Sequence, residues 1–291
     1  MKDLIPNTSY NYKISSTDRE GNSVTSEQGT FVTTPAQASI GSVRIGQVSL
    51  SVRNSGNNPY NSTPVRSGIP FPEGILTSSD QLRLIDNQDS EIPLQARPLG
   101  YWPDQSIKWV LLDFQADAAE RSEHVYTLEY GNEVSRNNFD TPLSVTENTD
   151  LLTVDTGRLN IIFDKHKFGP FAHISLDGSE YISNSQIVVN GSDAKQYIST
   201  NTSPETIEIE DSGPLHCVIR IEGSHLSNDG HRLLKSILRV NAYSGLPFVR
   251  IEHTFVNDNY EAPFTDIDSM YIDIHTHTSQ GPNKELNLIQ T

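Results

Sequence analysis

Apolar and polar residues alternate along most of this chain with a period of two, as in strands that bury one face and expose the other. Nowhere do apolar residues recur at helical spacing over three turns. Turn-rich segments of Gly, Asn, Asp, Ser and Pro separate the alternating runs. The pattern predicts an all-β protein with strands over residues 43–52, 109–112, 124–130, 151–164, 173–176, 187–190, 206–210, 216–223, 233–243, 248–257 and 270–278.

Residues 66–114 combine three different patterns. In LRLIDNQDSEIPL, apolar and polar residues alternate on both sides of a polar turn at residues 86–90, which predicts a β-hairpin. The continuous apolar run WVLL at residues 109–112 predicts a central strand that is covered on both faces. The glycines and prolines of GIPFPEG disfavour a helix or a long strand, so we expect a stiff connector that covers a small barrel.

The strands fall into two groups on either side of a polar, turn-rich linker at residues 132–142. The first group, residues 43–131, predicts a small β-barrel. The second group, residues 143–291, has longer strands and loops such as SNDG at residues 227–230, which predict a larger antiparallel β-sandwich that is incomplete. At 291 residues the chain is long enough for two domains of the usual ~100–200 residues each.

The first 35 residues have a pattern of their own. Apolar and polar residues alternate in a first run that contains Tyr10 and in a second run that ends near Pro35. Between the two runs, the Gly21-Asn22 pair predicts a hairpin turn. This segment resembles the last two strands of a fibronectin type III domain, with Tyr10 as its corner tyrosine. We interpret residues 1–35 as the truncated tail of such a domain.

A family resemblance rests on the predicted barrel. The residues that carry it are Gly68-Ile69-Pro70-Phe71-Pro72 with Gly74, then Gln95, Trp102-Pro103-Asp104 and Ser106-Ile107-Lys108-Trp109. They resemble the N-terminal RIFT-type barrel of the exo-rhamnogalacturonan lyase-like family, which includes the YetA-like proteins. Gln105 stands where that family usually has glycine, so we expect either another turn type or mild backbone strain there.

The resemblance also implies an organisation and a reaction. In this family the barrel is followed by a central β-sandwich, which residues 143–291 resemble more weakly, and then by an α/α toroid; no helical segment precedes Thr291. The family reaction is β-elimination on rhamnogalacturonan-type pectin, which needs a group to neutralise the uronate, a base and an acid. No catalytic motif of the family can be matched residue by residue, so we expect an inactive fragment whose catalytic groups lie on a missing downstream domain.

A second interpretation remains open. The alternative to the preferred lyase interpretation is a glycan-binding or spacer module of a surface protein with no enzymatic activity. A toroid-like region after Thr291 in the parent protein would favour the lyase interpretation, and further fibronectin or anchoring repeats would favour the module.

Charge and cysteine content restrict the partners. With 37 acidic against 21 basic residues the net charge is −16, which argues against binding to nucleic acid or to an anionic membrane. The single cysteine, Cys217, excludes a disulfide scaffold, and no apolar run is long enough for membrane insertion. We expect an extracellular or cell-surface protein whose secretion signal is not in this fragment, with a polysaccharide or oligosaccharide partner and no cofactor or metal.

Aromatic and polar residues near the end of the barrel motif are candidates for sugar contact. Tyr101, Trp102, Asp104 and Lys108 combine ring faces with hydrogen-bonding groups, and Trp102, ahead of Pro103, is the tryptophan expected to be exposed. The alternative is that these residues pack the core and shape the turn, as expected for Trp109 in its apolar run.

A second candidate cleft lies on the last predicted strand. Tyr271, Asp273, His275 and His277 share one face of it, while Met270, Ile272 and Ile274 face the core. An Asp-x-His-x-His strand is similar to the metal-binding strand of amidohydrolases, but the further ligands from a β/α barrel are missing, so a solvated face or cleft lip is the preferred interpretation.

Two strands before the last one carry further polar residues. His253, on an apolar face, is expected to be a core histidine with satisfied hydrogen bonds. If residues 233–243 and 248–257 pair, Arg239 would approach Glu252.

Overall fold

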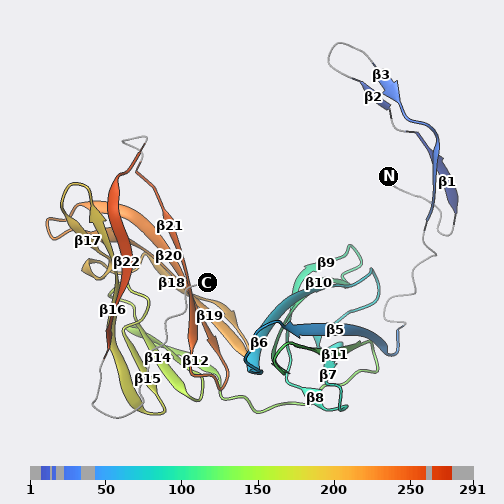
Figure 1. Ribbon diagram of the computed structural model, residues 1–291, viewed down its shortest axis with the longest axis horizontal. Coiled ribbons are helices and arrows are strands. Elements are labelled where there is room, and N and C mark those ends of the chain that lie inside the picture. Colours follow the sequence, from blue (N-terminus) through green and yellow to red (C-terminus); the bar gives the residue numbers. More distant parts are fainter. Residues whose placement is uncertain (1–7, 14, 18–22, 34–42, 260–263, 277–291) are drawn as a thin grey trace.

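The computed structural model describes residues 8–13, 15–17, 23–33, 43–259 and 264–276 (Figure 1). Their regular structure consists of β-strands and two short 3₁₀ turns, so the prediction of an all-β fold is confirmed. This part of the chain contains no helix that is long and apolar enough to cross a membrane.

The N-terminal segment is a two-stranded ribbon. It contains β1 (Ser9–Tyr12), β2 (Ser15–Thr17), β3 (Ser23–Thr25) and β4 (Gly29–Val32), with β1 antiparallel to β4 and β2 antiparallel to β3. Tyr10 lies opposite Phe31, with ring centroids 5.8 Å apart. The predicted Gly21-Asn22 turn lies outside the described residues, and the fibronectin interpretation stays a prediction.

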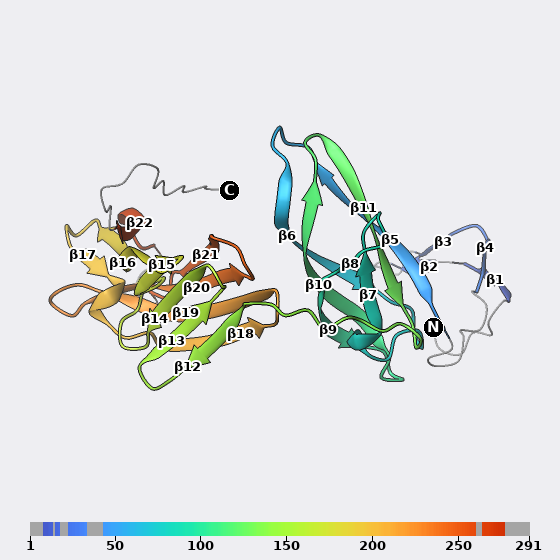
Figure 2. The ribbon, with the colours of Figure 1, turned by 90° about the horizontal axis from the view of Figure 1, so that it is seen from below.

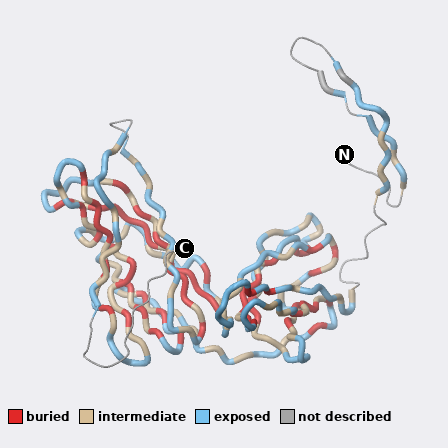
Figure 3. The backbone as a smooth tube through the Cα atoms, in the orientation of Figure 1, coloured by how far each residue is buried: buried red, intermediate tan, exposed pale blue. Residues whose placement is uncertain are grey.

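The barrel is made of two small antiparallel sheets. One has the order β6-β10-β9 and the other β5-β11-β7-β8. Their bounds are β5 (Gly46–Asn54), β6 (Tyr60–Pro70), β7 (Leu82–Ile85), β8 (Glu91–Ile92), β9 (Gln95–Tyr101), β10 (Ile107–Ala118) and β11 (Ser122–Tyr130), with a 3₁₀ turn at η1 (Ser79–Gln81). Both sheets contribute to one core that includes Leu84, Val110, Leu112 and Leu128, each fully buried. Figure 3 shows buried residues on strands of both sheets.

Two barrel predictions are confirmed. β7 and β8 form the expected hairpin, with Leu84 opposite Ile92. β10 is the central strand of its sheet, between β6 and β9.

Two other barrel predictions are wrong. Gly68 and Pro70 belong to the 11-residue strand β6, which pairs with β10, instead of to a connector. The prolines are tolerated because β6 is an edge strand of its sheet, where a missing N–H does not interrupt a ladder on both sides. The run at residues 109–112 is not covered on both faces, because Trp109 is 42% exposed.

The sandwich is built from one 11-stranded sheet of order β12-β13-β14-β15-β16-β17-β19-β20-β21, with β18 paired to β19 and β22 to β16. The bounds are β12 (Ser144–Glu147), β13 (Leu151–Asp155), β14 (Leu159–Asp164), β15 (His173–Leu176), β16 (Ser179–Gly191), β17 (Gln196–Ile198), β18 (Thr206–Ser212), β19 (His216–Leu226), β20 (Arg232–Tyr243), β21 (Val249–Val256) and β22 (Ile267–Thr276), with a 3₁₀ turn at η2 (Ser199–Asn201).

The short strand β17 connects the two halves of this sheet, since it pairs with β16 on one side and through Ile198 with Leu226 of β19 on the other. Side chains from both halves, including Phe163, Phe168, Ile187, Ile219 and Leu238, fill one core. The sheet therefore folds over on itself into a sandwich, which lies beside the barrel in both views (Figures 1 and 2).

One predicted sandwich strand is two strands in the structure. Residues 151–164 form two strands, β13 and β14, because the chain reverses at Thr156 and Gly157. Gly157 has a φ of +87°, which favours glycine, and its N–H donates to Asp155 Oδ1 at 2.7 Å. The Asp-Thr-Gly sequence contained this turn signal.

The turn before Lys108 is strained, as the departure from the family pattern suggested. Gln105 has a φ of +67° and its N–H donates to Trp102 O at 3.0 Å. Left-handed backbone costs a residue with a β-carbon about 1–2 kcal/mol, which glycine avoids. Glycine also has more freedom in the unfolded chain, which offsets part of that gain.

We therefore expect Gln105→Gly to raise the free energy of unfolding by about 0.5–1 kcal/mol in urea titrations. Gln88→Gly is the matched control: Gln88 also lies in a turn, but its φ is not positive, so this change should give no increase. A loss of stability in Gln105→Gly would contradict the assignment of strain.

Candidate functional site between barrel and sandwich

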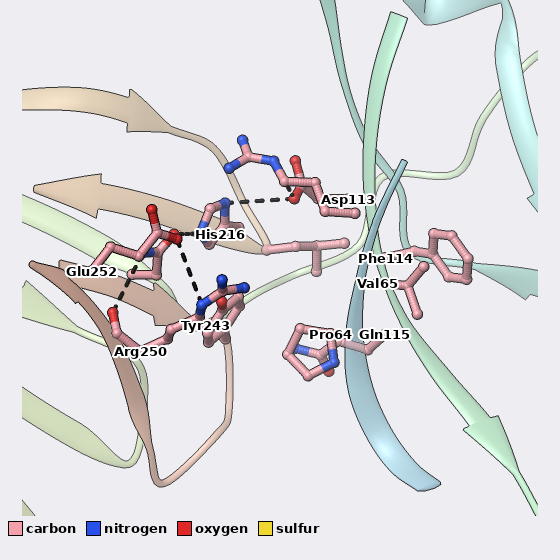
Figure 4. Close-up of a pocket in the computed structure, with 12 residues that line it drawn as sticks. Pro64, Val65, Asp113, Phe114, Gln115, His216, Tyr243, Arg250 and Glu252 are labelled. Carbon is pink, nitrogen blue, oxygen red and sulfur yellow. Dashed lines mark hydrogen bonds and ion pairs between the residues drawn. The ribbon is translucent and has the colours of Figure 1, made fainter. Parts of the chain in front are cut away.

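A polar pocket of about 220 Å³ lies where the barrel meets the sandwich (Figure 4). The barrel side comes from the paired strands β6 and β10, and the sandwich side from β19, β20, β21 and the residue before β19. Its charged and aromatic lining consists of Arg66, Asp113, Phe114, His216, Tyr243, Arg250 and Glu252. The site is therefore assembled by both halves of the chain.

Gln95, the first residue of β9, connects the barrel to the sandwich backbone. Its Oε1 accepts hydrogen bonds from the N–H groups of Leu215 and His216 at 3.0 and 2.9 Å, and its Nε2 donates to His216 O at 3.2 Å. Gly213 leaves room for this amide, because a β-carbon there would lie 2.2 Å from Gln95 Cδ. A second amide, Gln115 Nε2, donates to Ser244 O at 2.7 Å.

Beside Gln95, two buried carboxylates share one arginine. Arg66 Nε lies 3.1 Å from Asp113 Oδ1, and the same guanidinium pairs through Nη2 with Asp211 of the sandwich. Arg97 Nε lies 3.6 Å from the other oxygen of Asp211. Two positive and two negative groups thus balance, which offsets part of the cost of burying the carboxylates. We call Gln95, Arg66, Asp113 and Asp211 the interdomain latch.

His216 completes the cluster with one nitrogen unsatisfied. Asn241 Nδ2 donates a hydrogen bond to Arg250 O, so its other side-chain atom, Oδ1, faces His216 Nε2 at 3.0 Å. Oδ1 can only accept, so the Nε2–H of His216 is the donor of this hydrogen bond. The ring stacks on Tyr243, with centroids 4.9 Å apart. His216 Nδ1 has no hydrogen-bond partner among the described residues and lies 3.5 Å from Asp113 Oδ1.

Burial acts on this pair in opposite directions. It raises the pKa of Asp113 to about 6, against the lowering effect of Arg66, and it lowers the pKa of His216. An unprotonated Nδ1 and a carboxylate oxygen repel each other across 3.5 Å. A proton on either atom converts the contact into a hydrogen bond, and because the pKa of Asp113 is raised to about 6, Asp113 holds this proton below about pH 6.

The raised pKa has a consequence for stability. The pKa of an aspartate in the unfolded chain is ~3.9. Between about pH 4 and pH 6, the folded protein therefore binds more protons at Asp113 than the unfolded chain does. The stability due to this group is therefore present below about pH 4 and is lost as the pH rises through about 6. Burial of His216 acts in the opposite sense, because its lowered pKa costs stability as the pH falls.

We expect wild type to lose stability relative to Asp113→Asn when the pH is raised from about 4.5 to about 7, as measured by urea unfolding. His216 is present in both proteins, so most of its contribution cancels in the difference. A difference that does not change with pH would contradict the raised pKa of Asp113.

The same atoms define the group of possible metal ligands in the described part of the chain. Ligand atoms of Asp113, Asp211 and His216 lie within 4.8 Å of one another. Arg66, however, already provides the positive charge between the two carboxylates. The arrangement therefore favours an ion-pair network over a metal centre.

The residues expected to contact sugar lie on the β9–β10 hairpin, and part of this group has structural roles. Trp102 Nε1 donates to Phe71 O at 2.9 Å, and Lys108 Nζ covers one face of its ring at 4.5 Å. Asp104 Oδ1 accepts from both the N–H and the hydroxyl of Ser106, which holds the turn. Tyr101 is 56% exposed. The prediction that Trp102 is the exposed tryptophan is wrong: Trp102 is half-buried and Trp109 is exposed.

The second candidate group lies on β22, at a different place in the fold from the latch. Tyr271 is exposed, and Asp273 Oδ2 lies 3.1 Å from both His275 Nε2 and Gln186 Nε2. The hydrogen bond from His275, followed by that from Gln186, lowers the pKa of Asp273. His277 lies outside the described residues. Met270, Ile272 and Ile274 pack against the sandwich core as expected.

The two remaining predictions have mixed outcomes. His253 is half-buried, and its Nε2 lies 2.8 Å from Ser236 Oγ, so its ring has the expected hydrogen bond. Arg239 lies opposite Glu252 in the β20–β21 register, but its guanidinium pairs with Glu210, with contacts of 2.6 and 2.8 Å.

The latch could not be predicted from the sequence. Arg66 and Asp211 are 145 positions apart, and neither belongs to a recognisable motif. The available signals were Gln95, noted as a motif residue, and Arg66 and Asp113, which lie just outside the motif residues.

The fold and this interface define a class of protein in which a small β-barrel is joined by buried polar contacts to a large β-sandwich. Residues 49–130 match the PcRGLX-like N-terminal RIFT barrel domain, and residues 143–278 match the PcRGLX-like protein central beta sandwich domain. The chain belongs to the PcRGLX-like family, the exo-rhamnogalacturonan lyase-like family that its sequence resembles.

Individual relatives agree with this assignment. The chain is 27% identical over 209 residues to the uncharacterized protein YetA of Bacillus subtilis (strain 168), a match that covers 69% of this chain and 24% of YetA. The chain thus spans about a quarter of that relative's length.

Among solved structures, the fold is similar to an alpha-mannosidase from Enterococcus faecalis V583, with a TM-score of 0.52 and 11% identity over 78% of this chain and 31% of that one. It is also similar to a protein in the glycosyl hydrolase family 38 from Enterococcus faecalis, with a TM-score of 0.51 and 11% identity over 79% of this chain and 32% of that one. At this identity the likeness concerns the fold alone.

Proposed function

We propose that this chain is the non-catalytic barrel and central sandwich of a secreted polysaccharide lyase-like protein that acts on rhamnogalacturonan-type pectic glycans by β-elimination. In this proposal the two domains form an extracellular scaffold for a downstream α/α-toroid domain that carries the catalytic groups. The observation that carries it is the interdomain latch, because buried hydrogen bonds and ion pairs hold two domains in one defined geometry.

The burial of the titratable groups at the domain interface supports a scaffold more than an active site. Asp113 and His216 are the groups best suited to acid–base chemistry, but they are only 5% and 2% exposed. A glycan chain needs close approach of its reacting proton to such a base, within hydrogen-bond reach. Asp113 also pairs with Arg66, and His216 Nε2 is engaged by Asn241.

An assay of product formation tests the proposal. We expect the purified chain to release no unsaturated uronate from rhamnogalacturonan, followed by ultraviolet absorbance, and the parent protein that includes the downstream region to release it. Product from this chain alone would overturn the non-catalytic role. An inactive parent protein on all pectic glycans would overturn the lyase role.

The alternative function, a glycan-binding or spacer module without chemistry, has one observation in its favour. Leu99, Tyr101 and Trp109 are exposed apolar side chains on the barrel, as expected of a module that presents ring faces to a glycan. The two functions differ in the parent protein, since the module predicts glycan binding there without release of product.

A further inference from the structure

The barrel and the sandwich have separate apolar cores. Each cluster of buried apolar side chains in the described part of the chain draws on one domain alone. The joint between the two domains is instead made by polar groups, chiefly the amides of Gln95 and Gln115 and the guanidinium of Arg66. Two domains of one chain move relative to each other unless a large apolar interface holds them. The orientation of the barrel on the sandwich therefore depends on a few polar contacts.

One of these contacts lacks a proton donor. Asp113 Oδ1 of β10 and His216 Nδ1 of β19 face each other at 3.5 Å across the joint (Figure 4). The hydrogen bond to Asn241 takes the single N–H of a neutral imidazole, so Nδ1 is an acceptor, and an ionised carboxylate is also an acceptor. Nδ1 is buried and has no hydrogen-bond partner among the described residues. The two atoms attract each other only when the pair holds one further proton.

The charged and titratable groups around this pair come from five strands. They are Arg66 of β6, Arg97 of β9, Asp211 of β18, Tyr243 of β20, and Arg250 and Glu252 of β21. The arginines stay protonated at any pH at which the protein is folded. Burial raises the pKa of Tyr243, so its hydroxyl stays neutral. Asp211 lies between two guanidinium groups, and Glu252 pairs with Arg250 at 3.5 Å on the exposed rim. The buried Asp113–His216 pair is therefore the part of the joint whose contact depends on a proton.

We propose that the joint between barrel and sandwich is a proton-controlled hinge, closed while Asp113 and His216 share one proton and loosened when that proton is lost. With the proton, the two side chains form a hydrogen bond between β10 and β19, and either atom can carry it, because the proton belongs to the pair. Without the proton, two buried acceptors repel each other and oppose the contacts of Gln95 and Arg66. The hinge rests on this geometry, whereas its use, to change how the scaffold presents a downstream domain, rests on the proposed function.

The titration of Asp113 sets the size of the effect. Burial in the closed joint raises the pKa of Asp113 to about 6, whereas in an open joint water reaches the carboxyl and its pKa returns towards the ordinary 3.8. By linkage, the protonated joint then favours the closed form over the open form about a hundredfold more strongly than the deprotonated joint does. The closed form is thus favoured in acid and weakened as the pH rises to about 6.

Single-molecule energy transfer in the whole chain measures the ratio of closed to open molecules. Dyes attached through Glu120→Cys in the barrel and Ser179→Cys in the sandwich report on the two domains, because both positions are exposed and the native Cys217 is fully buried. With no further substitution, we expect the ratio to fall at least about tenfold between about pH 4.5 and about pH 7.5. The ratio should level off above about pH 6 and fall by no more than about tenfold for each pH unit, the limit for one proton.

Asp113→Asn in the same labelled chain removes the titration but keeps a donor, because its amide N–H donates to His216 Nδ1 at any pH. The ratio should then change less than about twofold over the same range. Asp273→Asn is the matched control, since Asp273 Oδ2 and His275 Nε2 form an exposed pair on β22, 3.1 Å apart, and its response should equal that of the unsubstituted labelled chain.

Thermal unfolding checks that each variant folds. A ratio that is independent of pH in the labelled chain without further substitution, including molecules that stay closed at every pH, would overturn the proposal. A fall steeper than one proton allows would do the same, and so would an undiminished response in folded Asp113→Asn. The product assay is separate: a pH-dependent ratio with an inactive parent protein supports the hinge and not the lyase role, and an active parent protein with a constant ratio has the opposite meaning.

Discussion

Replacing Arg66 with methionine is expected to lower the free energy of unfolding by about 3–5 kcal/mol, the usual cost of leaving a buried charge without its partner. Methionine keeps most of the aliphatic volume but removes the guanidinium between Asp113 and Asp211. The two carboxylates, only 5% and 8% exposed, would then repel each other across the domain interface. Urea unfolding of the purified variant at neutral pH measures the loss.

Arg53→Met is the matched control for this substitution. Arg53 Nη2 lies 3.5 Å from Glu123 on the surface, where both side chains are well exposed, so its loss should cost less than about 1 kcal/mol. Equal effects of the two substitutions would show that the pairing of Arg66 contributes no more than a surface ion pair.

Gln95→Ala is expected to cost about 2–4 kcal/mol and to separate the unfolding of the barrel from that of the sandwich. The substitution leaves the buried N–H groups of Leu215 and His216 and the carbonyl of His216 without their partner, and each such group costs about 1–3 kcal/mol when water cannot replace it. Relaxation at the interface would restore part of this loss. Scanning calorimetry should show two transitions in the variant where wild type shows one.

The control for Gln95 is Gln47→Ala. Gln47 Nε2 donates to Glu129 Oε1 at 3.0 Å within the barrel, and the residue itself is exposed, so the change should be small and the unfolding should stay cooperative. If Gln95→Ala retained a single transition at an unchanged temperature, the latch would not couple the two domains.

Much of the fold could be predicted because its determinants are local. Alternation with a period of two identifies strands such as residues 173–176 without knowledge of their partners, and the structure has β15 at these residues. The barrel motif around Gly68 and Trp102 was sufficient to indicate the family. The two errors have different causes. Pairing with β10 overrides composition at Pro70, which ends a paired edge strand, whereas a local turn at Gly157 divides one alternating run into two strands.

The exposure of the two tryptophans could not be predicted from local sequence patterns. Trp109 belongs to an apolar run, but β10 pairs with β6 and β9 so that its side chain projects from the outer face over Gly68. Trp102 precedes Pro103 and Asp104, so its sequence surroundings indicate exposure. In the structure its indole donates a hydrogen bond to Phe71 O, and Lys108 covers one face of the ring. Neighbours on other strands decide both cases.

The sequence by itself determined the all-β class and the family, because strand periodicity and motif spacing are properties of short segments. At Gln105 it left another turn type or mild strain open, and the φ of +67° in the structure decided for strain. Only the tertiary structure decided the interdomain latch and the exposed indole. Arg66 meets Asp211 across 145 positions of chain, and His216 comes to lie beside Asp113, because the sandwich docks on the sheet β6-β10-β9. Burial and charge pairing at such an interface depend on which distant residues it brings together.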